Sequence, residues 1–239
     1  MARSIAVLGA GPGLGQAVAH RYGREGYAVV LVARRPEPLD RLVAHLTADG
    51  VQAQALPADL ADPAAVPQLV DRIRATVGDL DVVYYGAAAD GFVPVLDLTP
   101  QHVHDLMPLG VHALLALVRE VLPAMIERGD GAILSAQGAS ALRGNPHIAG
   151  GLALAAQRNY LQALHAEVAG KGVYVGGLYI GAAIENTPFH AGLQAAKAAG
   201  HPVPDLPVVD PAHLADLLWT MHHTTRQPEA TYPDGLLAP

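Results

Sequence analysis

The chain begins with a short apolar run, Ile5 to Leu8, that passes directly into a glycine-rich segment with a helical pattern behind it. A buried strand, a glycine turn and a helix N-terminus in this order form a cradle for phosphate. Glycine lets the backbone turn tightly and lets a phosphate come close, and the free N–H groups and dipole of the helix hold the negative charge. The residues expected to contact a nucleotide are Gly9, Gly11, Pro12, Gly13, Leu14 and Gly15.

The spacing of these glycines distinguishes two kinds of cradle. The common dinucleotide fingerprint, Gly-x-Gly-x-x-Gly, needs a glycine at position 14, where this chain has leucine. The pattern that fits is Gly9-x-x-x-Gly13-x-Gly15. We favour a nucleotide cradle, and a plain turn between a strand and a helix is the alternative.

Composition narrows the class of protein. The chain has 239 residues, of which 51% are hydrophobic and 5% aromatic, so it can bury a substantial core made mostly of Ala, Val and Leu. The net charge of −7 and the lack of a basic run argue against nucleic acid and anionic membranes as partners. The chain has no cysteine, which excludes disulfides, thiol catalysis and Cys-ligated zinc.

The start of the chain and its hydropathy predict a location. The strand expected at Ile5 leaves no room for a signal peptide before it. No uninterrupted apolar run reaches the roughly 18 residues of a membrane span. We therefore expect a soluble, cytoplasmic protein.

Short apolar runs alternate with amphipathic stretches along the chain. The runs expected to form strands are 5–8, 28–32, 52–56, 82–85, 132–134 and 173–179. Helices are expected at 39–46 and 64–77, and Thr99-Pro100 and Asp210-Pro211 are typical helix starts. Repeated strand–helix units with apolar strands predict an α/β fold, a doubly wound, Rossmann-type parallel sheet with helices on both faces. No linker or repeat interrupts residues 1–239, so we expect a single domain.

Residues 181–209 differ from the rest of the chain. They contain several prolines and little periodicity, apart from a short helical stretch at 191–199. An insert behind the carboxyl end of a strand lies where ligands bind in such sheets, so we expect it to form a lid over the substrate. A disordered surface excursion is the alternative.

The end of the second expected strand reads Ala33-Arg34-Arg35. Dinucleotide folds that bind NAD carry an acid at this point for the adenosine ribose, whereas this chain has Ala33 followed by two guanidinium groups. Arginine suits a phosphate, so Arg34 and Arg35 predict the 2′-phosphate of NADP(H) as a ligand. A solvated loop end is the alternative. Asp59 and Leu60 close the third strand, where the carboxylate could accept from an adenine amino group or begin a helix.

The chain resembles the short-chain dehydrogenase/reductase superfamily over about residues 3–180. The resemblance rests on the glycine turn, the arginine after the second strand, Asp59-Leu60, the stretch 121–125 and the segment 158–175. It implies a doubly wound fold, a nicotinamide cofactor, a small-molecule substrate, and oxidation of an alcohol or reduction of a carbonyl. The family's cofactor-side positions after the fourth and sixth strands fall on Gly86, Ala87 and Gly181.

The catalytic half of the family pattern is missing. The family uses a Tyr-x-x-x-Lys pair, in which the lysine lowers the pKa of the tyrosine, together with a serine and an asparagine. This chain has two lysines, Lys171 and Lys197, and neither has a tyrosine four residues before it. The residues at the family's tyrosine, lysine, serine and asparagine positions are Gly150, Leu154, Gln137 or Gly138, and Gly110.

Three residues at the carboxyl ends of strands could replace the lost proton donor. Tyr85 ends the fourth strand, Tyr179 ends the sixth, and His147 follows the fifth. Tyr85 is the first choice, because the family places this position against the cofactor pocket. For each of them, the alternative is a ring that fills space with its polar end solvated. No His-x-x-x-His or compact carboxylate cluster occurs in the sequence, so we expect no metal site.

The sequence therefore predicts an NADP(H)-binding oxidoreductase of the short-chain dehydrogenase/reductase type. Its proton donor is atypical or is solvent, and its substrate is an activated small organic molecule. The alternatives are a non-redox isomerase, cyclase or lyase in the same pocket, and a cofactor-binding sensor without turnover. We also expect a homo-oligomer, a dimer or tetramer, because family members commonly associate and the segments 113–125 and 152–164 are rich in alanine and leucine.

Overall fold

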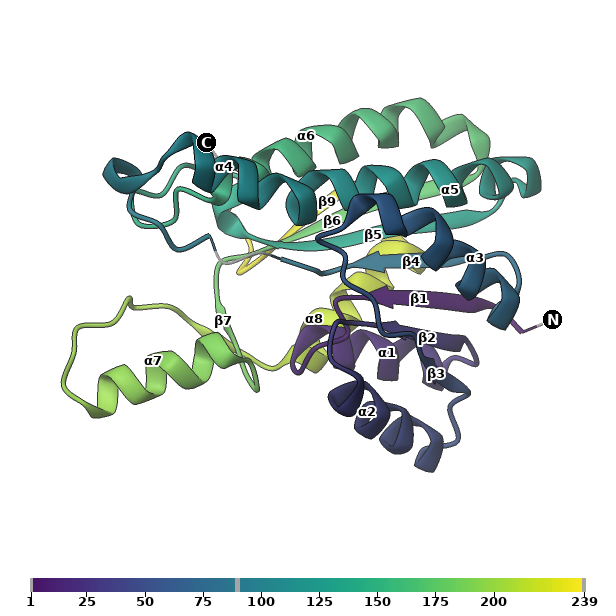
Figure 1. Cartoon of the computed structure of the whole chain (residues 1–239), viewed down its shortest axis with the longest axis horizontal. Helices are drawn as coiled ribbons and strands as arrows, with labels where there is room; N and C mark the ends of the chain where they lie inside the picture. Colours follow the sequence, from purple (N-terminus) through teal and green to yellow (C-terminus); the bar gives the residue numbers. More distant parts are fainter. Residues whose placement is uncertain (1, 89–90, 238–239) are drawn as a thin grey trace.

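One seven-stranded parallel sheet organises the protein (Figure 1). The computed structural model describes residues 2–88 and 91–237, and the strand order is β3-β2-β1-β4-β5-β6-β9. The strands of this sheet are β1 (Ser4–Leu8), β2 (Ala28–Val32), β3 (Ala53–Ala55), β4 (Val82–Tyr85), β5 (Gly131–Gly138), β6 (Val173–Ile180) and β9 (Glu229–Tyr232). A second, two-stranded parallel sheet pairs β7 (Ala183–Ile184) with β8 (Val208–Val209).

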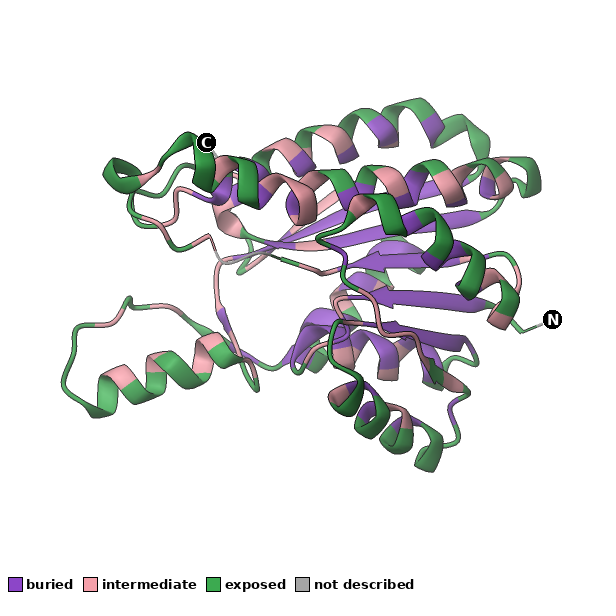
Figure 2. Cartoon of the chain, in the orientation of Figure 1, coloured by how far each residue is buried: buried purple, intermediate pink, exposed green. Residues whose placement is uncertain are grey.

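Helices cover both faces of the large sheet. The core on one face packs the sheet against α1, α2 and α8, and the core on the other packs it against α3, α5 and α6. The side chains of β1 alternate between these cores, and the central strands are buried along their length (Figure 2). The helices are α1 (Leu14–Arg24), α2 (Pro36–Ala48), α3 (Val66–Val77), α4 (Pro100–Met107), α5 (Ala113–Arg128), α6 (Gly151–Val168), α7 (Pro188–Ala198) and α8 (Pro211–Thr220).

The doubly wound fold predicted from the sequence is confirmed. All six expected strands form within a few residues of their predicted bounds. Both predicted helix starts are capped: Thr99 Oγ1 accepts from the backbone N–H of His102 at 3.2 Å, and Asp210 Oδ1 accepts from that of Ala212 at 2.8 Å. The edge strand β9 was not predicted. It contains a charged residue, Glu229, whose carboxylate binds Arg158 of α6.

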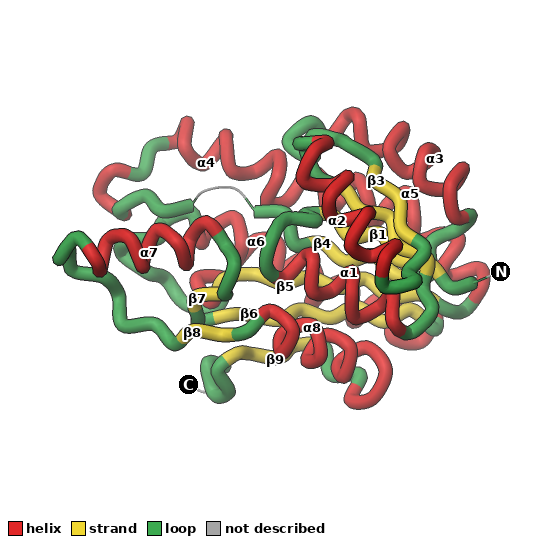
Figure 3. The backbone as a smooth tube through the Cα atoms, turned by 90° about the horizontal axis from the view of Figure 1, so that it is seen from below, coloured by secondary structure: helices red, strands yellow, loops and turns green. Residues whose placement is uncertain are grey.

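The insert 181–209 contains regular structure instead of an irregular loop. It forms β7, α7 and β8, and Thr187 Oγ1 caps α7 by accepting from the N–H of His190. Figures 1 and 3 place this insert at the carboxyl edge of the sheet, at the opposite end of the molecule from the N-terminus. No residue of α7 is buried. The helix therefore lies on the outside of the fold, and its predicted role as a lid stays a prediction.

The helical run Pro100–Arg128 is long and apolar enough to cross a membrane by length and composition alone. It joins α4 and α5 through a wider, π-type turn at Pro108–His112. Polar and charged residues interrupt it, so the sequence shows no unbroken apolar stretch of that length. In the structure α5 packs Leu114, Leu117 and Val121 against the sheet, as a core helix of a globular protein does.

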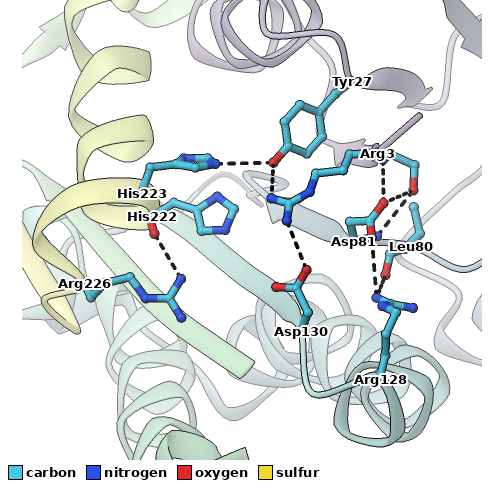
Figure 4. Close-up of polar contacts among 10 residues, drawn as sticks. Arg3, Tyr27, Leu80, Asp81, Arg128, Asp130, His222, His223 and Arg226 are labelled. Atoms are coloured by element: carbon cyan, nitrogen blue, oxygen red, sulfur yellow. Dashed lines mark hydrogen bonds and ion pairs between the residues drawn. The ribbon is translucent and has the colours of Figure 1, made fainter. Parts of the chain in front are cut away.

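Histidine, tyrosine and arginine side chains cluster at the amino-terminal edge of the sheet (Figure 4). His222 and His223 follow α8 in a π-type turn, and their rings lie 4.0 Å apart. The Nδ1 atom of His222 lies 3.1 Å from the Tyr22 hydroxyl, and the Nε2 atom of His223 lies 3.3 Å from the Tyr27 hydroxyl. Arg3 donates to the same Tyr27 hydroxyl.

Burial keeps His222 neutral in the folded protein. The ring is only 6% exposed, stacks on Tyr174, and lies near three cationic or ionisable groups, His223, Arg226 and Arg3. Burial first, and then these neighbours, lower the pKa of His222 to about 3. The folded protein therefore binds fewer protons here than the unfolded chain, whose histidines titrate near pH 6.5.

We expect the free energy of unfolding to fall as the pH drops from 7 toward 4. The contribution of His222 is fully present above pH 6.5, and by pH 5 it has decreased by about 2 kcal/mol. Denaturant unfolding at pH 7 and pH 5 measures this change. His222→Phe should remove most of the pH dependence, whereas the same change at the exposed His201 should leave it intact. An equal slope in wild type and His222→Phe contradicts the assignment.

Candidate functional site

The glycine turn between β1 and α1 brings backbone against backbone. Gly9 and Gly13 have φ angles of +94° and +90°, a region that favours glycine. A Cβ at position 15 would overlap the carbonyl oxygen of Gly9. Helix α1 begins at Leu14 without a side-chain cap, so its first N–H groups face the turn. The predicted succession of strand, glycine turn and helix is present, and that it binds phosphate stays a prediction.

Two other segments border this cradle. A Cβ at position 9 would lie 2.6 Å from the amide nitrogen of Ala87. The backbone that follows β4 therefore passes directly beside the turn. The methyl group of Thr187, at the start of α7, lies 2.6 Å from where a Cβ of residue 13 would be. The sheet order reverses between β1 and β4 at this point, which is where ligands bind in doubly wound folds. The cradle therefore has the insert as one wall.

The two arginines predicted to bind phosphate follow β2. Arg34 and Arg35 are exposed, and neither guanidinium makes a hydrogen bond or ion pair within residues 2–88 and 91–237. Ala33 is half-buried against the core. Asp59 has a local role: its Oδ1 accepts from the N–H of Ala61 at 3.0 Å, as a residue that begins a turn does. Leu60 is buried in the core.

A cavity of about 450 Å³ lies beyond the carboxyl ends of β5 and β6. It is enclosed by the segment after β4, the loop after β5, the start of α6 and the insert. The family-derived positions Gly110, Gly138, Gly150, Leu154 and Gly181 all line it. This volume is within the range of small-molecule sites.

Two phenylalanines, the only ones in the chain, lie across this cavity. Phe92 lies in the segment after β4, and Phe189 is in the first turn of α7. Their rings stack with centroids 5.1 Å apart and planes 13° apart. Both line the cavity, so an aromatic contact ties the insert to the body of the protein at the site.

The three predicted proton donors do not line the cavity. The Tyr85 hydroxyl donates to the carbonyl oxygen of Leu109 beneath α5, and the ring is 1% exposed. The Tyr179 hydroxyl donates to Glu229, which also binds Arg158. Burial raises the pKa of both tyrosines well above the usual range of a phenol. Their positions argue against catalysis and favour the alternative of packed rings.

His147 is exposed on the loop after β5, and it too is outside the described lining. Its backbone N–H donates to Asn145 Oδ1 at 2.9 Å. The geometry therefore gives this residue a part in the loop and no contact with the cavity.

Backbone from the segment after β4 packs against Gly150, the residue predicted at the family's tyrosine position. The N–H of Gly150 donates to the carbonyl oxygen of Gly91 at 3.1 Å, and that of Ala149 donates to Val93 at 2.9 Å. A Cβ at position 150 would overlap the Cα of Gly91 and lie 2.9 Å from its oxygen. No side chain fits at position 150 unless this segment moves.

A buried series of side-chain hydrogen bonds links β5 to α6. It was not predicted from the sequence. Gln157 Nε2 donates to the carbonyl oxygen of Gly110 at 2.8 Å, Ser135 Oγ donates to Gln157 Oε1, and Gln137 Nε2 donates to Ser135 Oγ. The carbonyl of Gly110 fixes the direction of this series, because only a donor can face it. The series ends in Gln137 Oε1, a buried acceptor without a protein donor in the described residues. Two glutamines and a serine within apolar runs were its only signal in the sequence.

We expect Tyr85→Phe to act on stability. Loss of the hydroxyl leaves the partly buried carbonyl of Leu109 without this donor, which should lower the free energy of unfolding by about 1–2 kcal/mol. Denaturant unfolding measures this change. Tyr232→Phe is the matched control, because no side-chain hydrogen bond of Tyr232 occurs in the part of the chain that the structure describes. An unchanged stability of Tyr85→Phe would count against the structural role.

A single added methyl group tests the contact between Gly150 and Gly91. Gly150→Ala should destabilise the protein by about 1–3 kcal/mol, because backbone atoms must separate to admit the Cβ. Gly144→Ala is the control: this glycine also lines the cavity, and a Cβ there meets no atom within 4 Å. Thermal unfolding of the two variants makes the comparison. Equal midpoints for both would show that the segment after β4 moves freely.

Comparison with known proteins agrees with this architecture. A 1-deoxy-11-beta-hydroxypentalenate dehydrogenase of Streptomyces exfoliatus is 32% identical over 206 residues, which are 83% of this chain and 73% of that protein. A fatty acyl-CoA reductase of Mycobacterium tuberculosis is 33% identical over 136 residues, 56% of this chain. The match spans only 46% of that reductase.

Solved structures share the fold over nearly the whole chain. An actinorhodin polyketide ketoreductase solved with NADPH has a TM-score of 0.88 at 23% identity, and the match covers 99% of this chain and 98% of the ketoreductase. A short-chain dehydrogenase from Streptomyces avermitilis has a TM-score of 0.82 at 26% identity, covering 96% of this chain and 87% of that protein. The family described as short chain dehydrogenase matches residues 3–197. The chain therefore belongs to the short-chain dehydrogenase family.

Proposed function

We propose that this protein binds NADP(H) in the glycine cradle and transfers a hydride to or from an activated small organic substrate in the adjoining cavity. The observation that carries the proposal is the cradle at the reversal of the sheet, with two exposed arginines just after the neighbouring strand β2 that have no partner among the described residues. Relatives of the same fold support the choice of cofactor. The actinorhodin ketoreductase was solved with NADPH, and a metagenomic short-chain oxidoreductase with NADP.

Residues of this chain fit the parts of such a cofactor. The backbone of Gly9 to Gly15 would hold the pyrophosphate at the N-terminus of α1. Arg34 and Arg35 would hold the 2′-phosphate through charge-assisted hydrogen bonds. Gly86, Ala87 and Gly181 would border the cofactor, since Ala87 adjoins Gly9 and Gly181 lines the cavity. NADP(H), when bound, supplies or accepts the hydride.

The cavity restricts what the substrate must be. Its described lining contains no tyrosine, histidine, lysine, aspartate or glutamate. General acid catalysis typically contributes 10²–10⁴-fold, and no side chain in the described lining is suited to provide it. A suitable substrate is therefore a carbon that accepts a hydride without simultaneous protonation by the protein, so that water supplies the proton.

The same observation favours a second candidate. A cavity without a described acid or base also suits a cofactor-binding sensor, or a non-redox enzyme in which the cofactor acts as a scaffold. Consumption of NADPH with a conjugated acceptor separates hydride transfer from both alternatives. Product formation without consumption of NADPH separates the non-redox enzyme from the sensor.

We also propose that the protein forms a homo-oligomer through α5 and α6. Leu115 on α5 and Leu152 on α6 are more than a third exposed, which supports an apolar contact there.

We expect NADPH to bind at least tenfold more tightly than NADH, because an Arg–phosphate contact is charge-assisted and contributes about 1.5–3 kcal/mol. Calorimetric titration of both cofactors measures the ratio. Arg34→Ala should reduce it toward one, whereas Arg24→Ala, at the far end of α1, should leave it unchanged. Equal affinities of the wild type for NADPH and NADH would remove the assignment.

A further inference from the structure

The polar side chains in the described lining of the cavity come from one segment. Ser140, Arg143 and Asn145 lie between β5 and α6, and every other described lining residue is apolar or a glycine. The apolar wall comes from several elements and includes Leu106, Leu142, Ile148, Leu154, Phe189 and Leu206. A ligand in this cavity therefore meets hydrogen-bonding side chains on one side only.

Arg143 is the only charged residue in the described lining. Its guanidinium makes no hydrogen bond or ion pair within the described ranges, 2–88 and 91–237. Arg34 and Arg35 are also without such a partner in the described ranges, but Arg143 differs from them because it lines the cavity. An unpaired guanidinium beside an apolar cavity is available to an anion from outside.

Asn145 adds a second donor at the same side. Its Oδ1 already accepts from the backbone N–H of His147 at 2.9 Å, and this bond fixes the orientation of the amide, because an N–H can only face the oxygen. The amide nitrogen is left to donate elsewhere. Together with the guanidinium, this edge offers donors and a positive charge to a ligand.

We propose that the cavity takes a carboxylic acid with an apolar body, and that Arg143 binds the carboxylate with help from Asn145. A planar guanidinium matches the two oxygens of a carboxylate, and one positive charge balances one negative charge, whereas a phosphate dianion would remain half-neutralised. The apolar wall then covers the carbon skeleton. This inference rests on the proposed function, because it names the substrate class of the same site.

Three probes with one carbon skeleton test the proposal: octanoate, octanamide and octylammonium. Calorimetric titration of the full chain should show that octanoate binds at least tenfold more tightly than octanamide, and that octylammonium does not bind. Arg143→Met keeps an apolar stem without the charge. It should abolish the preference for octanoate and leave octanamide binding unchanged. Arg24→Met, an exposed arginine outside the cavity, should keep the preference.

Two results would overturn the inference. One is equal binding of octanoate and octanamide to the wild type, and the other is a preference for octanoate that survives Arg143→Met. Leu154→Trp, checked for folding by circular dichroism, should block octanoate by filling the cavity, and retained binding would place the acid elsewhere. NADPH titration of the same proteins is independent. Loss of NADPH binding alone refutes the cofactor proposal, and loss of the octanoate preference alone refutes this one.

Discussion

Contact between backbone and backbone at glycines determines the carboxyl edge of this sheet. Gly15 packs on Gly9, Gly9 packs on Ala87, and Gly150 packs on Gly91, each so closely that a Cβ would meet main-chain atoms. These contacts bring the ends of β1 and β4, the start of α1 and the start of α6 together without side chains between them. The cradle and the cavity both exist because the chain has no side chains at these points.

The same close packing determines which groups can reach the cavity. The segment from Gly91 to Val93 accepts hydrogen bonds from the backbone of residues 149 and 150, and Gly150 is the residue predicted at the family's tyrosine position. A proton donor there would require this segment to move. Among the described lining residues, polar side chains come from the loop after β5, where Arg143 and Asn145 offer charge and hydrogen-bond donors. The described part of the site therefore offers groups that can bind and orient a ligand.

The sheet could be predicted from the sequence because each of its central strands is a continuous apolar run between turns. The glycine turn could be predicted because its spacing is local. The role of Tyr85 could not be judged in this way. Neighbouring residues of a strand point to opposite faces, and Tyr84 and Tyr85 both end in buried cores instead of one reaching the pocket. A hydroxyl partner such as Leu109, 24 residues away, leaves no local pattern.

Contacts between residues far apart in the sequence explain the other features that could not be predicted. Strand β9 has four residues, one of them a glutamate; its backbone pairs with β6, and Glu229 forms an ion pair with Arg158 of α6, 71 residues earlier. Arg143 lies in a loop without periodicity, and its importance follows only from the apolar walls that other segments bring around it. Such features depend on which segments meet, and local patterns carry no information about that.

The methyl group of Thr187 contacts Gly13 and so connects the cavity with the glycine cradle. Thr187 begins the helix of the insert that borders the cavity, and Gly13 begins the helix that borders the cradle. A ligand in the cavity that shifts this contact would change the free energy of binding in the cradle, and the reverse also holds. Thermodynamic linkage then requires reciprocity: whatever factor the acid in the cavity applies to cofactor affinity, the cofactor applies to the acid.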